Sequence, residues 1–535
     1  MAGDGIVSAE VVDSPAGEPA PVRWRELLTV VILVALADIA IYRGHGFAGW
    51  AVCFAAVPWA FLFGAPRSNM RGLRCHRPGA WTVGLLLTLL TIRMVWQGSP
   101  LQVAVGLVLV AAVAVSFCGV APTVFEVAVF PARMMLGGLL GLAEYRRSVR
   151  GPEWRLTRLR WLSVVFPLVT FLAFGVLFVL ANPDLLASFG RHVEQLLRSF
   201  REFLIRYSPH PTEILFWLAM AWVVVGMLRP VASKPLFGES LPDGKRFVTG
   251  SPAPLYAACR NTLITVIVLF AIYLVFEFQT LWFRTFPAGF YYSGYAHQGA
   301  AWLTVALALA TVVLSLVFRG AILREPRLKS LRRLAWLWSL ENVLLAVAVY
   351  HRLFIYIGFN GMTRMRVVGL LGISAVLVGF LLVVWKIARH HSFLWLVHRH
   401  LWTVAFAVYL FAVAPVDAIV VRYNVDRILA GDPAPSVQIT EHPISWEGVL
   451  LLAPLVDCDN PLIREGVRAH LAERWEQAAQ RSAAQQQEGW TSFQMVEHLV
   501  LRQLGELDRP LDQYADPGAR AAAWGRFREY AYQWY

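Results

Sequence analysis

The chain has 535 residues, of which 57% are hydrophobic and only 16% are charged. Soluble domains carry about 25% charged residues, so this composition excludes an ordinary soluble protein and predicts a membrane protein. The net charge of +13 does not indicate nucleic-acid binding, because residues 423–535 hold ten Arg and 16 Asp or Glu, which confines the basic excess to the apolar part. Five scattered cysteines predict neither a disulfide framework nor a metal site.

Long apolar stretches dominate the first four fifths of the chain. A helix needs roughly 20 apolar residues to cross the hydrocarbon core of a bilayer. We therefore predict an all-α fold, a polytopic membrane helix bundle of about eleven transmembrane helices with a small helical C-terminal domain. The predicted spans are 25–42, 47–63, 80–96, 101–121, 160–181, 212–229, 255–278, 300–318, 336–357, 367–385 and 401–421.

A further stretch, 123–143, is interrupted by Glu126, Pro131 and Arg133, and we expect an interfacial or re-entrant helix there. Residues 185–207 place apolar side chains at helical spacing with arginines between them, which predicts an amphipathic helix in the outer interface.

The chain divides into three parts. Residues 1–22, rich in Ala, Gly, Pro and acids, are expected to be disordered, 23–422 form the transmembrane domain, and 423–535 form a helical tail. In the tail, Asn460 before Pro461, Ser492 and Pro517 predict three helix starts. Densely basic connections fall at alternate turns, which predicts a bacterial cytoplasmic (inner) membrane protein with a cytoplasmic N-terminus and an extracytoplasmic tail. These connections are 64–79, 144–160, 319–333 and 386–400.

Five stretches in order resemble a family of bacterial multi-pass membrane proteins that is known only as a domain of unknown function, of the four-one-seven-three type. They are "LADIAIYRGHGFAGWAVCF" (36–54), "ANPDLLASF" (181–189), "FPAGFYYSGYAHQGAAWL" (286–303), "YIGFNGMTRMRV" (356–367) and "YNVDRIL" (423–429). The resemblance implies a membrane protein of this layout and assigns no reaction.

Polar residues inside apolar spans are the candidate functional residues, because a charged side chain at mid-bilayer costs about 2.5–3.5 kcal/mol on insertion scales. Some lie near span ends, where arginine can reach the interface, and we interpret them as structural; they are Arg93, Arg260, Glu277 and Arg352. The remaining substrate- or proton-binding candidates are Asp38, Glu341, Asn342, His351 and Asp417. They form either a static hydrogen-bonded network or the lining of a wet cavity.

Two of the charged residues in the ninth span share a helix face. Glu341 and Arg352 are eleven residues apart, which is close to three helical turns and about 16 Å along the axis. They cannot pair with each other, so each needs a partner on another helix.

The connection 279–299 is crowded with aromatic residues, among which Trp282, Tyr291, Tyr292 and Tyr295 are candidates for an outer aromatic loop. The loop is either an interfacial belt or a stacking platform for a lipid head group or sugar. Four histidines at 390–400 lack nearby carboxylates or cysteines, so no metal is expected. The chain has no common hydrolase, zinc-protease or nucleotide-binding motif, and no cofactor is expected.

Three hypotheses of function remain open. The first is a secondary transporter or exporter of a small polar or lipid-like substrate, although the sequence shows no internal repeat. The second is a non-catalytic envelope scaffold or sensor whose tail binds an extracytoplasmic protein. The third, an enzyme acting on a lipid-linked substrate, needs Glu341, His351 and the aromatic loop to converge. Besides the lipid bilayer, no partner, substrate or oligomeric state is assigned.

Overall fold

The fold was analysed in a computed structural model. It describes residues 22–64, 77–149, 209–231, 252–282, 292–318, 327–389, 393–506 and 511–535, together with residues 167, 169–171 and 391. Every regular element in these ranges is a helix, which confirms the predicted all-α class. The predicted span 160–181 and the predicted amphipathic helix at 185–207 lie almost entirely outside the described residues, as does the N-terminal segment before Val22.

Among the described helices, nine are long and apolar enough to cross a membrane, so the chain is a multi-pass membrane protein. Their outward faces fit a bilayer. On the helix of residues 77–96, for example, Trp81 is 77% exposed and Ile92 62% exposed, which is the pattern expected where lipid is the solvent. Seven of the nine match predicted spans, and another covers the stretch that we expected at the interface. The remaining one, Leu394–Val413, overlaps the predicted span 401–421 only in part, because its helix ends at Val413 and a new helix begins at Val416. The total of about eleven spans stays a prediction.

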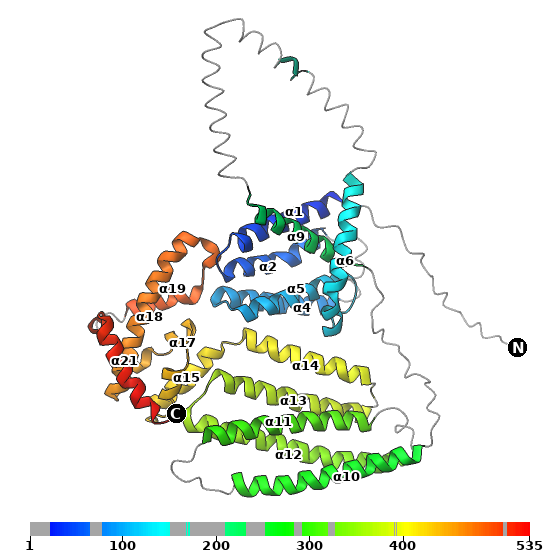
Figure 1. Cartoon of the computed structure of the whole chain (residues 1–535), viewed down its shortest axis with the longest axis vertical. Helices are drawn as coiled ribbons and strands as arrows, with labels where there is room; N and C mark the ends of the chain where they lie inside the picture. Colours follow the sequence, from blue (N-terminus) through cyan, green and yellow to red (C-terminus); the bar gives the residue numbers. More distant parts are fainter. Residues whose placement is uncertain are drawn as a thin grey trace, which may run out of the picture.

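The membrane helices form two groups that lie one above the other in Figure 1. The first helical group, coloured blue to green, has its own buried apolar core. It consists of α1 (Trp24–Ala37), the π-helix η1 (Asp38–Tyr42), α2 (Phe47–Gly64), α4 (Arg77–Trp96), α5 (Pro100–Phe117), α6 (Val124–Val149) and α9 (Pro211–Leu228).

The second helical group, coloured green to yellow, has two buried apolar clusters of its own. It consists of α10 (Pro252–Glu277), the π-helix η2 (Phe278–Trp282), α11 (Tyr292–Val317), α12 (Leu328–Asn360), α13 (Arg364–Arg389) and α14 (Phe393–Val413). The last of these, α14, packs against α4, α5 and α6 of the first group. Gln102 Nε2 donates to Ala412 O at 3.0 Å, and Tyr409 OH donates to Leu86 O at 2.9 Å, so hydrogen bonds join the two groups along α14.

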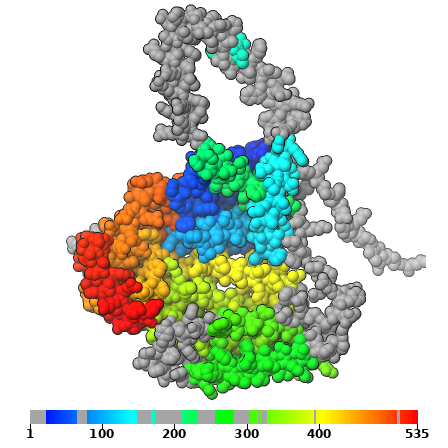
Figure 2. Space-filling view, viewed as in Figure 1, coloured from blue at the N-terminus to red at the C-terminus, as the bar shows by residue number. Residues whose placement is uncertain are grey.

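The tail covers one end of both groups, on the left of Figure 1 and in orange and red in Figure 2. Its helices surround a separate apolar core that includes Val421, so the tail as described from here on begins at Val416 and not at the predicted residue 423. They are α15 (Val416–Leu429), α16 (Ser436–Glu441), α17 (Trp446–Leu450), η4 (Ala453–Asp457), α18 (Pro461–Glu488), η5 (Trp490–Ser492), α19 (Met495–Gly505), η6 (Asp512–Tyr514) and α21 (Pro517–Tyr532).

Local sequence explains where several of these helices begin. Ser99 and Gln102 form a reciprocal capping box at the start of α5, with Pro100 in the first helical position. Asn460 caps α18 and Pro517 opens α21, as predicted. The prediction for Ser492 was wrong: α19 begins only at Met495, because the Ser492 hydroxyl donates to Gly489 O at 2.9 Å and closes the preceding turn instead.

The stretch 123–143 forms α6, which continues without a break to Val149 and therefore does not turn back on itself as a re-entrant helix would. By length and composition α6 is able to cross a membrane. In Figure 1, however, it runs across the direction of α2, α4 and α5, at the end of the bundle away from the tail. Glu126 and Arg133, which interrupt the apolar stretch, form an ion pair of 2.7 Å with each other. An interfacial position for α6 stays a prediction.

Hydrogen bonds tie the tail to the turns of both helical groups. On the first group, Arg93 Nη2 of α4 lies 2.8 Å from Glu447 Oε1 of α17. On the second, Met362 N donates to Asn424 Oδ1 at 2.7 Å, and Asn424 Nδ2 donates back to Met362 O at 2.9 Å. Arg427 of α15 also donates to two carbonyl oxygens near the end of α12, that of Ile357 at 2.9 Å and that of Gly358 at 2.7 Å. The tail therefore bridges the two groups at one end of the bundle.

Candidate functional site

The five predicted polar candidates do not lie together. Asp38 belongs to the first helical group, Glu341, Asn342 and His351 lie on α12 of the second group, and Asp417 lies in the first turn of α15. Three separate environments therefore have to be considered.

Asp38 is buried and fully paired. It opens the π-helix η1, where Trp217 Nε1 donates to Asp38 Oδ1 at 2.8 Å and Arg43 Nε lies 3.0 Å from Asp38 Oδ2. Arg43 also pairs with Glu213 in the first turn of α9. These contacts join the end of α1 to α9. We therefore interpret Asp38 as a residue that holds these two helices together.

Asp417 is paired as well. Both oxygens of its carboxylate accept hydrogen bonds from the guanidinium of Arg364, the first residue of α13. Arg364 is half exposed, so this pair lies at the surface between the bundle and the tail and not inside the bundle.

The remaining candidates, Glu341 and Asn342, carry buried polar atoms without partners. Glu341 is 8% exposed and Asn342 is completely buried. Among the described residues, Glu341 Oε2 and Asn342 Oδ1 have no hydrogen-bond partner, and neither has Nε1 of the buried Trp338 one turn earlier. Asn342 Nδ2 donates to Trp338 O at 2.7 Å. Residues three and four apart share one side of a helix, so Trp338, Glu341 and Asn342 form one cluster, here called the α12 polar cluster.

Apolar side chains surround the α12 polar cluster. The Trp338 ring meets the edge of Phe270 with ring centroids 5.7 Å apart. The same buried core includes Leu263 of α10, Leu307 of α11 and Phe380 of α13. Because α12 packs on all three of these helices, the unpaired atoms lie inside the second group.

His351 is half-buried, nine residues after Asn342, and so lies on the opposite side of α12. Its neighbour Arg352 does have the interhelical partner that the sequence required, because it forms a buried ion pair with Glu277 of α10. Our interpretation of Glu277 and Arg352 as residues that reach the interface was incomplete. The opposite charges of Glu277 and Arg352 could have suggested an ion pair. The sequence does not reveal the relative rotation of α10 and α12, on which the contact depends. Glu341 has no such charged partner among the described residues.

The described residues of the expected aromatic loop, 279–282 and 292–299, are helical. Trp282 ends η2, and Tyr292 and Tyr295 lie in the first turn of α11, so the prediction of a loop was wrong for these residues. Residues 292–299 contain no proline that would prevent the helix from starting ahead of the apolar stretch. Tyr291 lies outside the described residues. A stacking platform stays a prediction.

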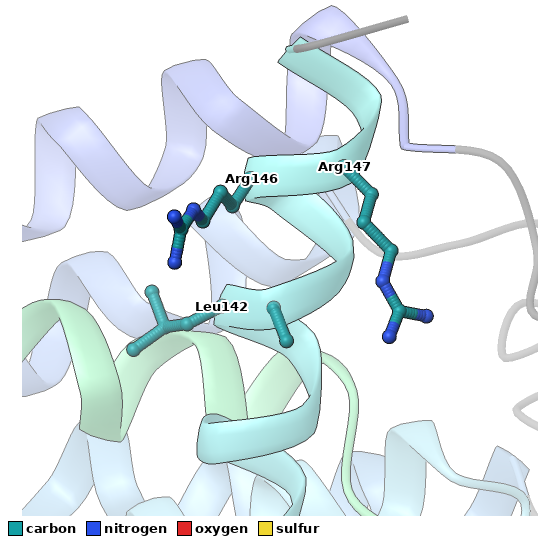
Figure 3. Close-up of a pocket in the computed structure, with 4 residues that line it drawn as sticks. Leu142, Arg146 and Arg147 are labelled. Carbon is teal, nitrogen blue, oxygen red and sulfur yellow. The ribbon is translucent and has the colours of Figure 1, made fainter.

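Neither of two further features has the geometry of a ligand-binding site. A pocket at the end of α6 is lined by Leu142, Ala143, Arg146 and Arg147, but the two arginines point to opposite sides of the helix and do not converge (Figure 3). In the described ranges no group of three or more His, Cys, Asp or Glu is placed to hold a metal ion. His398 and His400 each direct Nδ1 to the carbonyl oxygen four residues earlier, at 3.0 and 2.9 Å.

Comparison with known proteins places the chain in a family without assigning a reaction. No curated protein and no solved structure matches it. The family model of the domain of unknown function DUF4153 matches residues 30–440, which include all the membrane helices described from α2 to α14 as well as most of α1. This confirms the resemblance seen in the sequence and corrects the family number. The chain belongs to the DUF4153 family.

Proposed function

We propose that this protein is a secondary transporter or exporter of a small polar or lipid-like substrate, in which the α12 polar cluster binds a proton or a polar group of the substrate. One observation carries the proposal: Glu341, Asn342 and Trp338 bury three unpaired polar atoms inside a membrane helix group. Each buried polar atom without a partner costs about 1–3 kcal/mol. Stability therefore does not account for this cluster, whereas a ligand that completes its hydrogen bonds does.

The chemistry of the α12 polar cluster suits proton coupling. An isolated carboxylate in apolar surroundings is far more costly than a neutral carboxylic acid, so we expect Glu341 to hold a proton when no substrate is bound. The neutral acid donates one hydrogen bond and accepts others, while Asn342 Oδ1 accepts and Trp338 Nε1 donates. Loss of the proton to one side of the membrane would then favour binding of a cationic or hydrogen-bonding substrate.

The arrangement of the two helical groups is compatible with alternating access. The two groups meet along α14, and only 11% of the residues in the apolar stretch of that helix are buried. Many secondary transporters expose their binding site to the two sides in turn by rocking one helix bundle against another. The weakly buried α14 would allow such movement.

We also propose the orientation given by the basic connections, with the N-terminus in the cytoplasm and the tail outside the cytoplasmic membrane. In support, α1 ends beside the tail, since His45 N donates to Thr491 Oγ1 at 3.2 Å, so that α1 begins at the opposite end of the bundle. An impermeant thiol reagent should label a Trp475→Cys variant in intact cells. Labelling only after lysis would reverse the orientation.

Water access to the α12 polar cluster tests the transport proposal. The five native cysteines are replaced, and single cysteines are introduced as Glu341→Cys, Asn342→Cys and Val349→Cys. Val349 is completely buried on the same side of α12 but has apolar neighbours, so it is the matched control. Each variant is treated with an impermeant thiol reagent in intact cells and in inside-out vesicles.

Labelling at 341 and 342 but not at 349 is the expected result, and it means that a wet pathway reaches the cluster. If none of the three positions reacts while the tail control does, the cluster is sealed and the transport proposal fails. Equal labelling at 349 would indicate a loosened bundle and would also count against a defined pathway.

A second candidate is an envelope scaffold or sensor that acts through the tail. The observation in its favour is that the tail is bonded to both helical groups, through Glu447 on the first and Asn424 on the second. A partner bound to the tail would thereby alter how the groups sit against each other. A sealed α12 polar cluster in the labelling experiment would make this candidate the leading one.

A further inference from the structure

The short segment that joins α18 to α19, taken together with Met495 at the start of α19, buries polar side chains and exposes apolar ones. Its inward-facing residues are polar and buried: Thr491 is 4% exposed, Ser492 9% and Gln494 8%. Its outward-facing residues are large and apolar: Trp490 is 49% exposed, Phe493 39% and Met495 46%. A segment that faced water would place these two sets the other way round.

The polar side of this segment is bonded to the ends of membrane helices. His45 N in the α1–α2 turn donates to Thr491 Oγ1 at 3.2 Å. Gln494 accepts a hydrogen bond from Gly98 N in the α4–α5 turn and donates to Met94 O of α4 at 3.3 Å. The inward polar residues therefore satisfy backbone groups at two turns of the first helical group.

The approach to the first of these turns is close. A Cβ atom on Gly46 would lie 2.7 Å from Ser492 Cα and 2.8 Å from Thr491 O, so only glycine lets the segment lie against the turn. The membrane-spanning helix α2 begins at Phe47, the next residue. The segment is thus level with the end of a membrane span.

We propose that Trp490, Phe493 and Met495 insert into the head-group region of the lipid bilayer beside the first helical group, so that this segment anchors the tail to the membrane surface. The helices α2 and α4 are long and apolar enough to cross a membrane, and α2 begins and α4 ends at the turns beside which these side chains are exposed. Tryptophan is favoured at that depth, because its ring system is buried among acyl chains while the indole N–H faces the head groups, and Phe493 and Met495 add apolar area beside it. The apolar side chains thus extend the lipid-facing surface of the spans.

The anchor complements the hydrogen bonds beneath it. Backbone-directed hydrogen bonds such as those of Gln494 are weakened where water competes for the same groups. Apolar side chains in the interface would exclude water from the contact between tail and turns. The inference concerns the tail and the lipid, and it holds or fails independently of transport through the bundle.

Depth measurement with a spin label tests the anchor. Single cysteines are introduced in the cysteine-free protein as Trp490→Cys, Phe493→Cys and Met495→Cys, labelled with a nitroxide and reconstituted into phosphatidylethanolamine–phosphatidylglycerol vesicles. Trp475→Cys is the matched control: Trp475 is 42% exposed and lies beside Gly505, at the end of α19 away from the turns. Collision rates are measured with oxygen, which concentrates in lipid, and with a polar nickel chelate, which stays in water.

At 490, 493 and 495 we expect collisions with oxygen to exceed those with the nickel chelate, and at 475 we expect the reverse. A nickel-chelate accessibility at all three positions equal to that at 475 would show that the segment faces water and would overturn the proposal. Low accessibility to both reagents would also overturn it, because a protein surface would then cover the segment. Size-exclusion profiles equal to the cysteine-free parent show that each labelled variant is folded, and agreement among the three positions guards against a local effect of one substitution.

Discussion

Arg352 on α12 donates two parallel hydrogen bonds, each 2.5 Å long, to the two carboxylate oxygens of Glu277 on α10. Arg352 is 5% exposed and Glu277 is completely buried, and Tyr273 OH donates to the same carboxylate at 2.9 Å. Two helices separated by the whole of α11 in the sequence are thereby fixed in rotation and register.

Removing one partner of this pair should be more harmful than removing both. Arg352→Ala leaves the Glu277 carboxylate buried without a counter-charge, and we expect a loss of about 3–5 kcal/mol in the free energy of unfolding. The double variant Glu277→Leu with Arg352→Leu should recover most of that loss, because apolar side chains tolerate the site. Thermal unfolding of the purified protein in detergent measures the difference. A double variant as unstable as the single one would contradict this account of the pair.

Glu341 should behave in the opposite way. Since Glu341 Oε2 has no hydrogen-bond partner, Glu341→Leu removes an uncompensated polar group at similar volume. We expect an unfolding free energy that is unchanged or higher by about 1–3 kcal/mol. The matched control is Leu345→Ala, one turn further along the same buried side of α12, which should lose about 2–5 kcal/mol by leaving a cavity.

A marked loss of stability in Glu341→Leu would contradict the proposed role of Glu341, because it would mean that the carboxyl group holds the bundle together. If Glu341→Leu keeps its stability but water no longer reaches the α12 polar cluster, the carboxyl group serves function and not folding. The same variant therefore tests both meanings of a buried polar residue.

Helix positions followed from local composition, whereas contacts between helices did not. The predicted span 47–63 matches α2 to within one residue, and 80–96 lies within α4, which begins three residues earlier, because a span needs only a sufficient run of apolar side chains. No feature of the sequence predicted the π-helix at Asp38–Tyr42, since its composition does not differ from that of the α-helix before it. Whether a buried acid is paired depends on the rotation of two helices, which neither sequence segment specifies by itself.

The sites could be predicted only in part for the same reason. Glu341 and Asn342 were identified because polar residues are rare in spans, but Trp338 was missed because tryptophan is common in this chain. The contacts beneath the tail were not predictable, because Gln494 binds the backbone atoms Gly98 N and Met94 O. Backbone groups are the same in every residue, so the sequence of the turn does not reveal the contact.

Substitution of Gly361 should be more harmful than substitution of Gly431, and both glycines have positive φ. The φ of Gly361 is +100°, and a Cβ atom there would lie 2.5 Å from Asn424 Oδ1 and 3.0 Å from Pro435 Cβ. Gly361→Ala therefore combines backbone strain of about 1–3 kcal/mol, since φ +100° with ψ −170° is a conformation almost confined to glycine, with the loss of the Asn424 hydrogen bonds to Met362, at about 0.5–1.5 kcal/mol each. Gly431 has φ +92° with no atom within 4 Å of the added Cβ, so Gly431→Ala should show the strain alone.

Limited proteolysis of the tail in lipid nanodiscs measures the difference between the two glycine variants. We expect Gly361→Ala to expose tail cleavage sites that remain protected in the parent and in Gly431→Ala. Equal protection of both variants would mean that Asn424 does not hold the tail to the α12–α13 turn.

Acid should weaken the tail through His470. Its ring stacks on Trp524 with centroids 4.7 Å apart, and Nε2 is shielded from solvent without a hydrogen-bond partner. Burial lowers the pKa of His470 from 6.5 to about 4, and the charge of Arg474 acts in the same direction. Below pH 6.5 the unfolded chain binds a proton that the folded tail does not, so the stability due to neutral His470 is complete above pH 6.5 and is lost as the pH falls towards 4. At about 1.4 kcal/mol per pH unit, the loss across this window amounts to about 3 kcal/mol.

His470→Phe keeps the stack on Trp524 and removes the titration, so its unfolding free energy should fall less than that of the parent between pH 7 and pH 4.5. Comparing the two proteins is necessary because burial raises the pKa of Glu447 and of Glu497, and protonation of these acids in the folded tail opposes the loss over the same range. Those acids are present in both proteins and cancel in the difference. Parallel pH dependences of the parent and the variant would mean that the His470 ring reaches water in the folded tail. A ring that is protonated to the same extent in the folded and unfolded chains contributes nothing to the pH dependence of stability.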